Sequence, residues 1–131
     1  MVFIDSNVPM YLVGAAHPNK VDAQRRLEQL VADRVRLVTD AEVMTEILHR
    51  YVALERRGYI QAAYDVLLGV VDEVLPIDRV VVEGAKQVVL QYPGLPVRVG
   101  LHVAVMQRHG IEQVLSFDAG FERVPRIVRV R

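Results

Sequence analysis

The stretch VFIDSN at residues 2–7 decides the fold that this sequence predicts, because three apolar residues run directly into an aspartate, a serine and an asparagine. A short apolar run bounded by polar residues is typical of a buried strand. An aspartate at the end of such a strand often only forms a turn or caps a helix. Asp5 therefore gains a functional meaning only if other polar residues meet it at the same place in the fold.

Strand-like and helix-like patterns alternate along the rest of the chain. We expect strands over residues 2–5, 35–39, 73–78, 113–118 and 126–130, and helices after Asn7 and over residues 19–33, 41–56, 59–71, 79–91 and 97–109. The last of these helices is apolar on nearly all sides, which favours a buried position. The alternation predicts an α/β, Rossmann-like fold in which helices flank a central parallel sheet of four to five strands.

Three local signals refine the boundaries of these elements. Asn7 can cap the helical turn that follows the first strand. Thr39 and Glu42 have the spacing of a capping box at the start of the helix over 41–56. Pro76 has no amide hydrogen to donate, so the third strand is expected at an edge of the sheet.

Length and composition predict one globular domain over residues 1–131, with 52% apolar and 24% charged residues. No apolar run approaches the roughly 18–20 residues that a membrane-spanning helix needs, and nothing before residue 2 resembles a signal peptide. The chain contains no cysteine, which excludes disulfides and thiolate metal ligands. Its formal net charge is zero, so no global field recruits nucleic acid. We therefore expect a cytoplasmic protein that does not associate with membranes.

Polar residues gather where three of the expected strands end, at residues 5–7, 39–40 and 116–118. In open parallel sheets, ligands bind beyond the carboxyl ends of the strands, near the point where the strand order reverses. If the first and fourth strands are neighbours, Asp5 and Asp118 emerge at the same edge. Two carboxylates that face each other across a few ångströms repel each other unless a cation or a proton lies between them. Hard cations prefer oxygen ligands, so this edge predicts a site for Mg²⁺ or Mn²⁺.

Glu46 is a third candidate for this acidic site. It lies on the flank of the apolar stripe of the helix over 41–56, from where its carboxylate can point over the edge of the sheet. The alternative is that Glu46 belongs to a solvated face and pairs with Arg50 four residues later. Spacing alone leaves both interpretations open.

Taken together, these motifs resemble the PIN domain family, and in particular the VapC-type toxins of bacterial toxin–antitoxin pairs. The resemblance rests on FIDSN at residues 3–7, AEVMTEIL at 41–48 and SFDAGFERV at 116–124. It extends through GLHVAVMQRHGIEQVLSFDAGF at 100–121, where helix, glycine stop, strand and aspartate follow in the order of the family.

The resemblance implies a metal-dependent ribonuclease, a hydrolase with a Rossmann-like PIN fold. Acidic residues of PIN proteins bind Mg²⁺ or Mn²⁺ and activate water against an RNA phosphodiester. Asp5, Glu46 and Asp118 match three of these catalytic, metal-binding acids, and Asn7 and Ser116 match the polar residues that orient them. The resemblance also implies an RNA substrate, a homodimer and a VapB-like antitoxin, whose peptide occupies a groove and inserts an arginine into the acidic pocket.

One position departs from the family pattern. The third acid of the family lies in the first turn of the penultimate helix, where this chain reads VRVGLHVA at residues 97–104 and has Val99 at the acidic position. An aliphatic side chain neither binds a cation nor orients a water. Either the chain is a degenerate PIN-like binding module that engages an antitoxin or RNA without cutting, or Val99 inactivates a nuclease. His102, one turn later, is either a substitute ligand or a core or interface residue.

Overall fold

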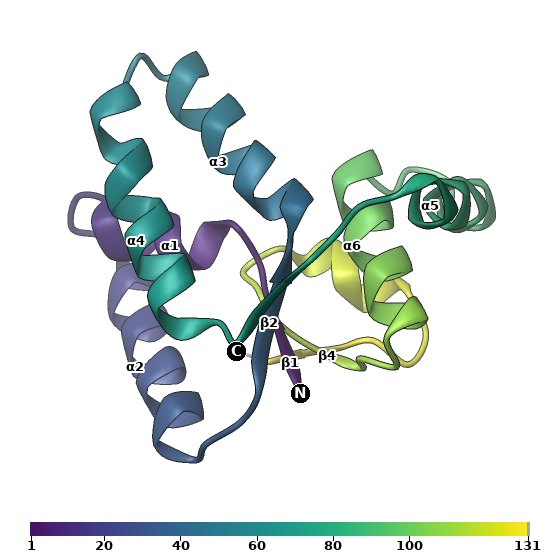
Figure 1. Cartoon of the computed structure of the whole chain (residues 1–131), viewed down its shortest axis with the longest axis horizontal. Coiled ribbons are helices and arrows are strands. Elements are labelled where there is room, and N and C mark those ends of the chain that lie inside the picture. Colours follow the sequence, from purple (N-terminus) through teal and green to yellow (C-terminus); the bar gives the residue numbers. More distant parts are fainter. Residues whose placement is uncertain (131) are drawn as a thin grey trace.

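The predicted alternation of strands and helices is confirmed by the structure, a computed structural model that describes residues 1–130 (Figure 1). The elements are β1 (Val2–Ile4), α1 (Asn7–Val13), α2 (Pro18–Ala32), β2 (Leu37–Asp40), α3 (Ala41–Ala53), the 3₁₀ helix η1 (Arg57–Tyr59), α4 (Ile60–Val70), β3 (Glu73–Leu75), α5 (Arg79–Gln91), α6 (Val97–Arg108), β4 (Gln113–Leu115), the 3₁₀ helix η2 (Ala119–Arg123) and β5 (Val128–Val130). The strands are shorter than expected. Strands β1 and β4 end before the polar residues that follow them, whereas β2 begins two residues later and keeps Thr39 and Asp40 in its ladder.

Five parallel strands form one sheet in the order β3-β2-β1-β4-β5. The central strand β1 is fully apolar and buried, as a strand covered on both faces must be. Ile4 pairs with Leu115, so the residues that follow them, Asp5 and Ser116, leave the sheet side by side. The strand order reverses between β1 and β4, which places both at the switch point where ligands bind in such sheets.

Helices cover both faces of the sheet. Helices α1, α2 and α4 lie together on one side, and α5 and α6 lie together on the other (Figure 1). Helix α3 starts at the carboxyl end of β2 and contacts both α4 and α6. One apolar core joins the sheet to these helices. Within the part of the chain that the structure describes, no helix has the length and apolar character needed to cross a membrane.

Two of the expected helix caps are wrong. Asp40, not Thr39, caps α3, and its Oδ1 accepts a hydrogen bond from the Val43 amide at 2.9 Å. Thr39 instead donates from Oγ1 to the Ile4 carbonyl at 2.8 Å, because its side chain faces the neighbouring strand β1. Asn7 does not cap α1 either: it is the first helical residue, and its side chain turns toward the end of β4.

The expected positions of β3 and α6 agree with the structure. Strand β3 lies at an edge of the sheet, and Pro76 follows its last residue. Helix α6 is buried over most of its length, although its first residue, Val97, is 67% exposed. Burial of α6 matters for function because this helix carries Arg98, Val99 and His102 toward the carboxyl edge of the sheet.

Gly100 allows α6 to approach α5 closely. A Cβ atom at Gly100 would lie 2.7 Å from Cγ1 of Val89 and 3.6 Å from the Ala85 carbonyl oxygen. Real side chains do not tolerate the first of these distances without a shift, and the β-branched Val89 has little rotamer freedom on a helix. At Gly84 of α5, the corresponding atom would lie 3.5 Å from Cβ of Ala104, an ordinary contact.

We expect opposite effects from adding one methyl group at these two glycines. Gly100→Ala should lower the free energy of unfolding by about 1–2 kcal/mol, because overpacking outweighs the gain in helix propensity. Gly84→Ala should raise it by roughly 0.5–1 kcal/mol, because the helix gains without a clash. Urea unfolding of both variants measures this. Equal stabilisation by the two substitutions would show that α5 and α6 have room to spare.

Candidate functional site

Side chains from four elements or their ends converge at the carboxyl edge of β1, β2 and β4. Asp5 follows β1, Asp40 ends β2, Glu46 comes from α3 and His102 comes from α6. Asp5, Asp40 and His102 have no exposed surface. Three carboxyl groups and one imidazole therefore lie close together, only Glu46 among them is partly exposed, and the groups must neutralise one another.

Asp5 is held by hydrogen bonds on both of its carboxylate oxygens. Its Oδ1 accepts from the Ser6 amide at 2.7 Å, and its Oδ2 accepts from the Ser116 hydroxyl at 2.6 Å. The Asn7 amide donates to Asp5 Oδ2 at 3.4 Å and to Ser116 Oγ at 3.2 Å. Burial raises the pKa of the Asp5 carboxyl; the neighbouring His102 acts against this increase, and Glu46 adds to it.

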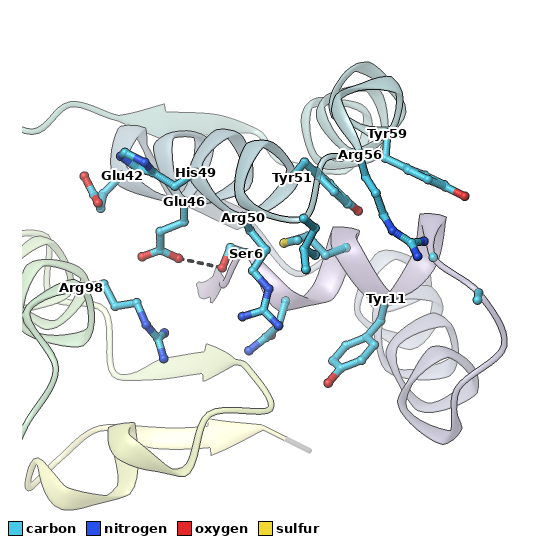
Figure 2. A pocket seen from close by; sticks show the side chains of 15 residues that line it. Ser6, Tyr11, Glu42, Glu46, His49, Arg50, Tyr51, Arg56, Tyr59 and Arg98 are labelled. Atoms are coloured by element: carbon cyan, nitrogen blue, oxygen red, sulfur yellow. Dashed lines mark hydrogen bonds between the residues drawn. The ribbon is translucent and has the colours of Figure 1, made fainter.

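Glu46 points toward Asp5 from α3. Its Oε2 accepts from the Ser6 hydroxyl at 2.7 Å (Figure 2). Its Oε1 lies 2.6 Å from Nε2 of His102. Burial is the largest single influence on Glu46 and opposes its ionisation, but the hydrogen bond and charge of His102, the hydrogen bond from Ser6 and the charge of Arg98 together lower the pKa of Glu46. The alternative pairing of Glu46 with Arg50 does not occur among the described residues.

His102 occupies the centre of the cluster and is fully buried. Its Nδ1 lies 2.8 Å from Asp40 Oδ2, while its Nε2 faces Glu46 Oε1 at 2.6 Å and Asp5 Oδ1 at 3.7 Å. Burial disfavours the charged imidazolium, but the hydrogen bonds and charges of these carboxylates raise the pKa of His102 well above its usual 6.5. His102 is thus a fully buried residue whose imidazole contacts carboxylates, and the two interpretations, a metal ligand or a core residue, both stay open.

Asp118 lies at the same edge, but its carboxylate is engaged elsewhere. Its Oδ1 accepts from the Gly120 amide at 2.8 Å, and its Oδ2 accepts from the Arg98 guanidinium at 2.5 Å. Burial opposes the charge of Arg98, but this bond to Asp118 raises the arginine's pKa. Asp118 still connects to Asp5 through Ser116, whose Oγ accepts from the Asp118 amide at 3.0 Å.

One group of side chains has the spacing of metal ligands. Asp5, Glu46 and His102 each offer an atom, and these atoms lie within 4.8 Å of one another. Val99, which the family resemblance predicts as the position of the third acid, is fully buried, and a Cβ added at Gly120 of η2 would lie 3.7 Å from Val99 Cγ2. It offers no oxygen to a cation.

A pocket of about 840 Å³ opens beside this cluster (Figure 2). It is lined by Ser6, Asn7, Met10, Tyr11, Gly14, Ala15, Glu42, Glu46, His49, Arg50, Tyr51, Leu54, Arg56, Tyr59 and Arg98. The guanidinium groups of Arg50, Arg56 and Arg98 face the space between α1 and α3. Glu46 and Ser6 therefore belong both to the buried cluster and to a basic, partly aromatic groove that is open to a ligand.

The sequence indicated some of these residues but not their roles. The polar pair Thr39-Asp40 at a strand end signalled Asp40 as part of the edge, but the partner His102 lies 62 residues away and no spacing connects them. In the sequence, Arg98 was identified only as the neighbour of Val99. Its pairing with Asp118 depends on how α6 is placed against η2, which sequence patterns do not specify.

The PIN domain family pattern matches residues 2–127. The VapC ribonuclease Mb1869c of Mycobacterium bovis and Ribonuclease VapC13 of Mycobacterium tuberculosis are each 56% identical to this chain over 130 residues, covering 99% of both sequences. Ribonuclease VapC23 of Mycobacterium tuberculosis is 37% identical over 118 residues, covering 90% of this chain and 93% of that protein.

Solved structures share the fold at low sequence identity. VapC20 of Mycobacterium tuberculosis, a toxin that cleaves the sarcin-ricin loop, has a TM-score of 0.82 at 21% identity and covers 100% of this chain and 99% of its own. A chain from a toxin–antitoxin complex of Klebsiella pneumoniae has a TM-score of 0.69 at 16% identity, and the match covers 98% of this chain and 96% of that chain. A chain of VapBC2 of Rickettsia felis, bound to a promoter DNA fragment, has a TM-score of 0.72 at 14% identity, and the match covers 99% of this chain and 98% of that chain.

The raised pKa of His102 makes the stability of the metal-free protein depend on pH. The folded state keeps this proton when the unfolded chain has lost it, so the stabilisation is complete below pH 6.5 and disappears as the pH rises through the folded pKa. We expect the free energy of unfolding in EDTA to fall above pH 6.5, by at most about 1.4 kcal/mol per pH unit.

Chemical denaturation between pH 6 and pH 9 measures this slope. His102→Gln should remove most of it, whereas the exposed control His109→Gln should keep it. The same slope in His102→Gln and in the unchanged protein would contradict the assignment of the proton to His102.

Proposed function

We propose that this chain, which belongs to the VapC-type ribonucleases of the PIN domain family, cleaves RNA with a divalent metal ion held at the acidic edge of its sheet. The observation that carries the proposal is the meeting of Asp5 and Glu46 at the switch point, with Asp118 linked to Asp5 through Ser116. We assign Asp5, Glu46 and Asp118 as the catalytic acids.

The donor set suits a hard divalent cation. Asp5 and Glu46 present carboxylate oxygens. Ser6 and Ser116 donate to the two oxygens of Asp5 and Ser6 donates to Oε2 of Glu46, so both carboxylates are held in place for an ion. We propose Mg²⁺ or Mn²⁺ as the ion. When bound, such an ion lowers the pKa of a coordinated water and neutralises charge on the phosphate.

The other polar residues position these groups and the RNA. Asn7 and Ser116 fix the orientation of Asp5, and the Asn7 side-chain oxygen also accepts from the Phe117 amide at 3.3 Å, which holds the loop after β4 against β1. Arg98 has a side chain 44% exposed at the mouth of the pocket. We propose that it contacts a phosphate of the RNA, since a guanidinium binds phosphate well.

A catalytically degenerate binding module is the second candidate function. Val99 favours it, because the side chain at the third acidic position cannot bind an ion. The remaining acids favour the nuclease, because burying Asp5 and Glu46 together costs stability and yet the chain keeps both. Both candidates share the fold, so the question is whether the cluster acts on RNA or only binds a partner.

We also propose that an antitoxin occupies the pocket between α1 and α3. The neighbouring structures from Klebsiella pneumoniae and Rickettsia felis are of a toxin–antitoxin complex and of VapBC2. The bond between Arg98 and Asp118 supports this proposal, because it demonstrates that a guanidinium fits at the acidic edge. An antitoxin arginine that binds there would compete with a metal ion.

The assembly and the setting of the protein follow from the same proposal. We propose that residues 1–131 form one PIN domain, that it works as a homodimer as the family resemblance implies, and that it acts in the cytoplasm, where its RNA substrate is found. Light scattering of the purified protein tests the homodimer.

RNA cleavage with Mn²⁺ by this chain and by Val99→Asp tests the nuclease. We expect both to cleave, and the variant to be faster by roughly tenfold or more, because an added carboxylate strengthens metal binding. Asp5→Asn should abolish cleavage and weaken metal binding in both backgrounds. Cleavage by the variant alone would mean that the unchanged chain is a binding module, and folded but inactive protein in both cases would refute the nuclease.

A further inference from the structure

The proposed metal site has lost one acid, but a nitrogen ligand stands in the space beside it. We propose that His102 replaces the missing carboxylate as the third protein ligand, and that the resulting Asp5–Glu46–His102 site selects Mn²⁺, Co²⁺ or Zn²⁺ over Mg²⁺. This inference rests on the proposed metal dependence, and it adds a nitrogen ligand to the proposed acidic site and a preference among divalent ions.

The distances within the cluster fit a shared ion. His102 Nε2 lies 2.6 Å from Glu46 Oε1 and 3.7 Å from Asp5 Oδ1. Atoms that bind one ion at about 2.1 Å lie roughly 3–4 Å apart, so small rotations of the side chains open the space that an ion needs. An ion bound here would replace the hydrogen on Nε2 of His102. In the metal-free protein, the protonated imidazole neutralises the same two carboxylates.

Asp40 orients the imidazole for this role. Its Oδ2 binds Nδ1 of His102 at 2.8 Å, which directs Nε2 toward Asp5 and Glu46. Its Oδ1 accepts from the Val43 amide as the cap of α3, so Asp40 itself is fixed by backbone. Histidines that bind metal ions in proteins typically donate their second nitrogen to a carboxylate in this way, which fixes the ring and makes it a stronger ligand.

Aromatic packing holds the ring in the same orientation. The imidazole centroid lies 5.2 Å from the ring of Phe3 and 6.3 Å from the ring of Phe121, which is stacked at an angle of 20°. His102 is one helical turn after Val99, so both project from the same side of α6. From that side of the helix, the imidazole reaches the carboxylates of Asp5 and Glu46.

Asp118 is less ready than His102 to be the third ligand. Its Oδ2 is paired with the guanidinium of Arg98, and an ion at that oxygen would have to displace this positive charge. It also lies outside the group of ligand atoms within 4.8 Å of one another among the described residues. The proposed catalytic role of Asp118 remains compatible with a position at the edge of the metal site.

The ligand type determines the ion class. Mg²⁺ prefers carboxylates and water, keeps several waters and rarely takes nitrogen ligands. Imidazole suits Zn²⁺, Co²⁺ and Fe²⁺, and Mn²⁺ accepts both oxygen and nitrogen. Two carboxylates and one imidazole therefore favour transition metals, whereas the acid that Val99 replaces would have shifted the balance toward Mg²⁺.

Pulsed EPR of the Mn²⁺-loaded full chain tests the ligand directly, without a substitution. Protein labelled with ¹⁵N-histidine should give the nitrogen coupling of an imidazole bound to Mn²⁺, shifted from ¹⁴N to ¹⁵N relative to unlabelled protein. The sequence has only four histidines. His102→Gln should lose the coupling, while His49→Gln, an exposed histidine of the adjoining pocket, should keep it. Bound Mn²⁺ without histidine coupling would overturn the proposal.

Competition titrations test the ion class. His102→Gln should bind Mn²⁺ and Co²⁺ at least tenfold more weakly and change the affinity for Mg²⁺ by less than about threefold. Equal losses for Mg²⁺ and Mn²⁺ would overturn the selectivity. RNA cleavage is measured separately: histidine-bound Mn²⁺ without cleavage refutes the nuclease alone, and cleavage without histidine coupling refutes this inference alone.

Discussion

The burial of several carboxylates in one small volume is the constraint on which the rest of this structure depends. Asp5 and Asp40 have no exposed surface, and Glu46 reaches the same space from α3. Charges of one sign that are removed from water destabilise a fold strongly unless a partner of opposite sign is present. His102 supplies that partner in the metal-free state. The positions of α3 and α6 over the sheet are therefore linked through charge as well as through apolar packing.

The same arrangement connects the fold to the chemistry of a PIN ribonuclease. The parallel strands deliver Asp5 and Ser116 side by side, and the loop after β4 brings Asp118 next to them. Helix α6 contributes Arg98, Val99 and His102 within a little more than one turn: a cation at the rim, an apolar residue in the family's acidic position and an imidazole in the centre.

Sequence patterns predicted most of the fold because they depend on local alternation and on turn residues. The parallel sheet and the edge position of β3 were predicted in this way, whereas the adjacency of β1 and β4 was only assumed and is observed in the structure. The caps at Thr39 and Asn7 were wrong because side chains that suit a cap bound to neighbouring strands instead. Sequence patterns did not predict the contacts of His102 with Asp40 and of Arg98 with Asp118. Each contact joins residues that are far apart in the sequence and depends on how α6 packs. The three acidic candidates were chosen correctly as residues of one edge, whereas their roles are still proposals.

Asp40 illustrates how a fold can restrict the sequences that are able to encode it. Serine, threonine, asparagine and aspartate are all good caps for a helix, so position 40 would be free to vary among them if capping α3 were its only duty. Its second oxygen, however, faces an imidazole. Only aspartate can cap the helix with one oxygen and balance a positive ring with the other. Evolutionary drift at position 40 therefore requires a matching change at position 102, and related chains should exchange these two residues as a pair.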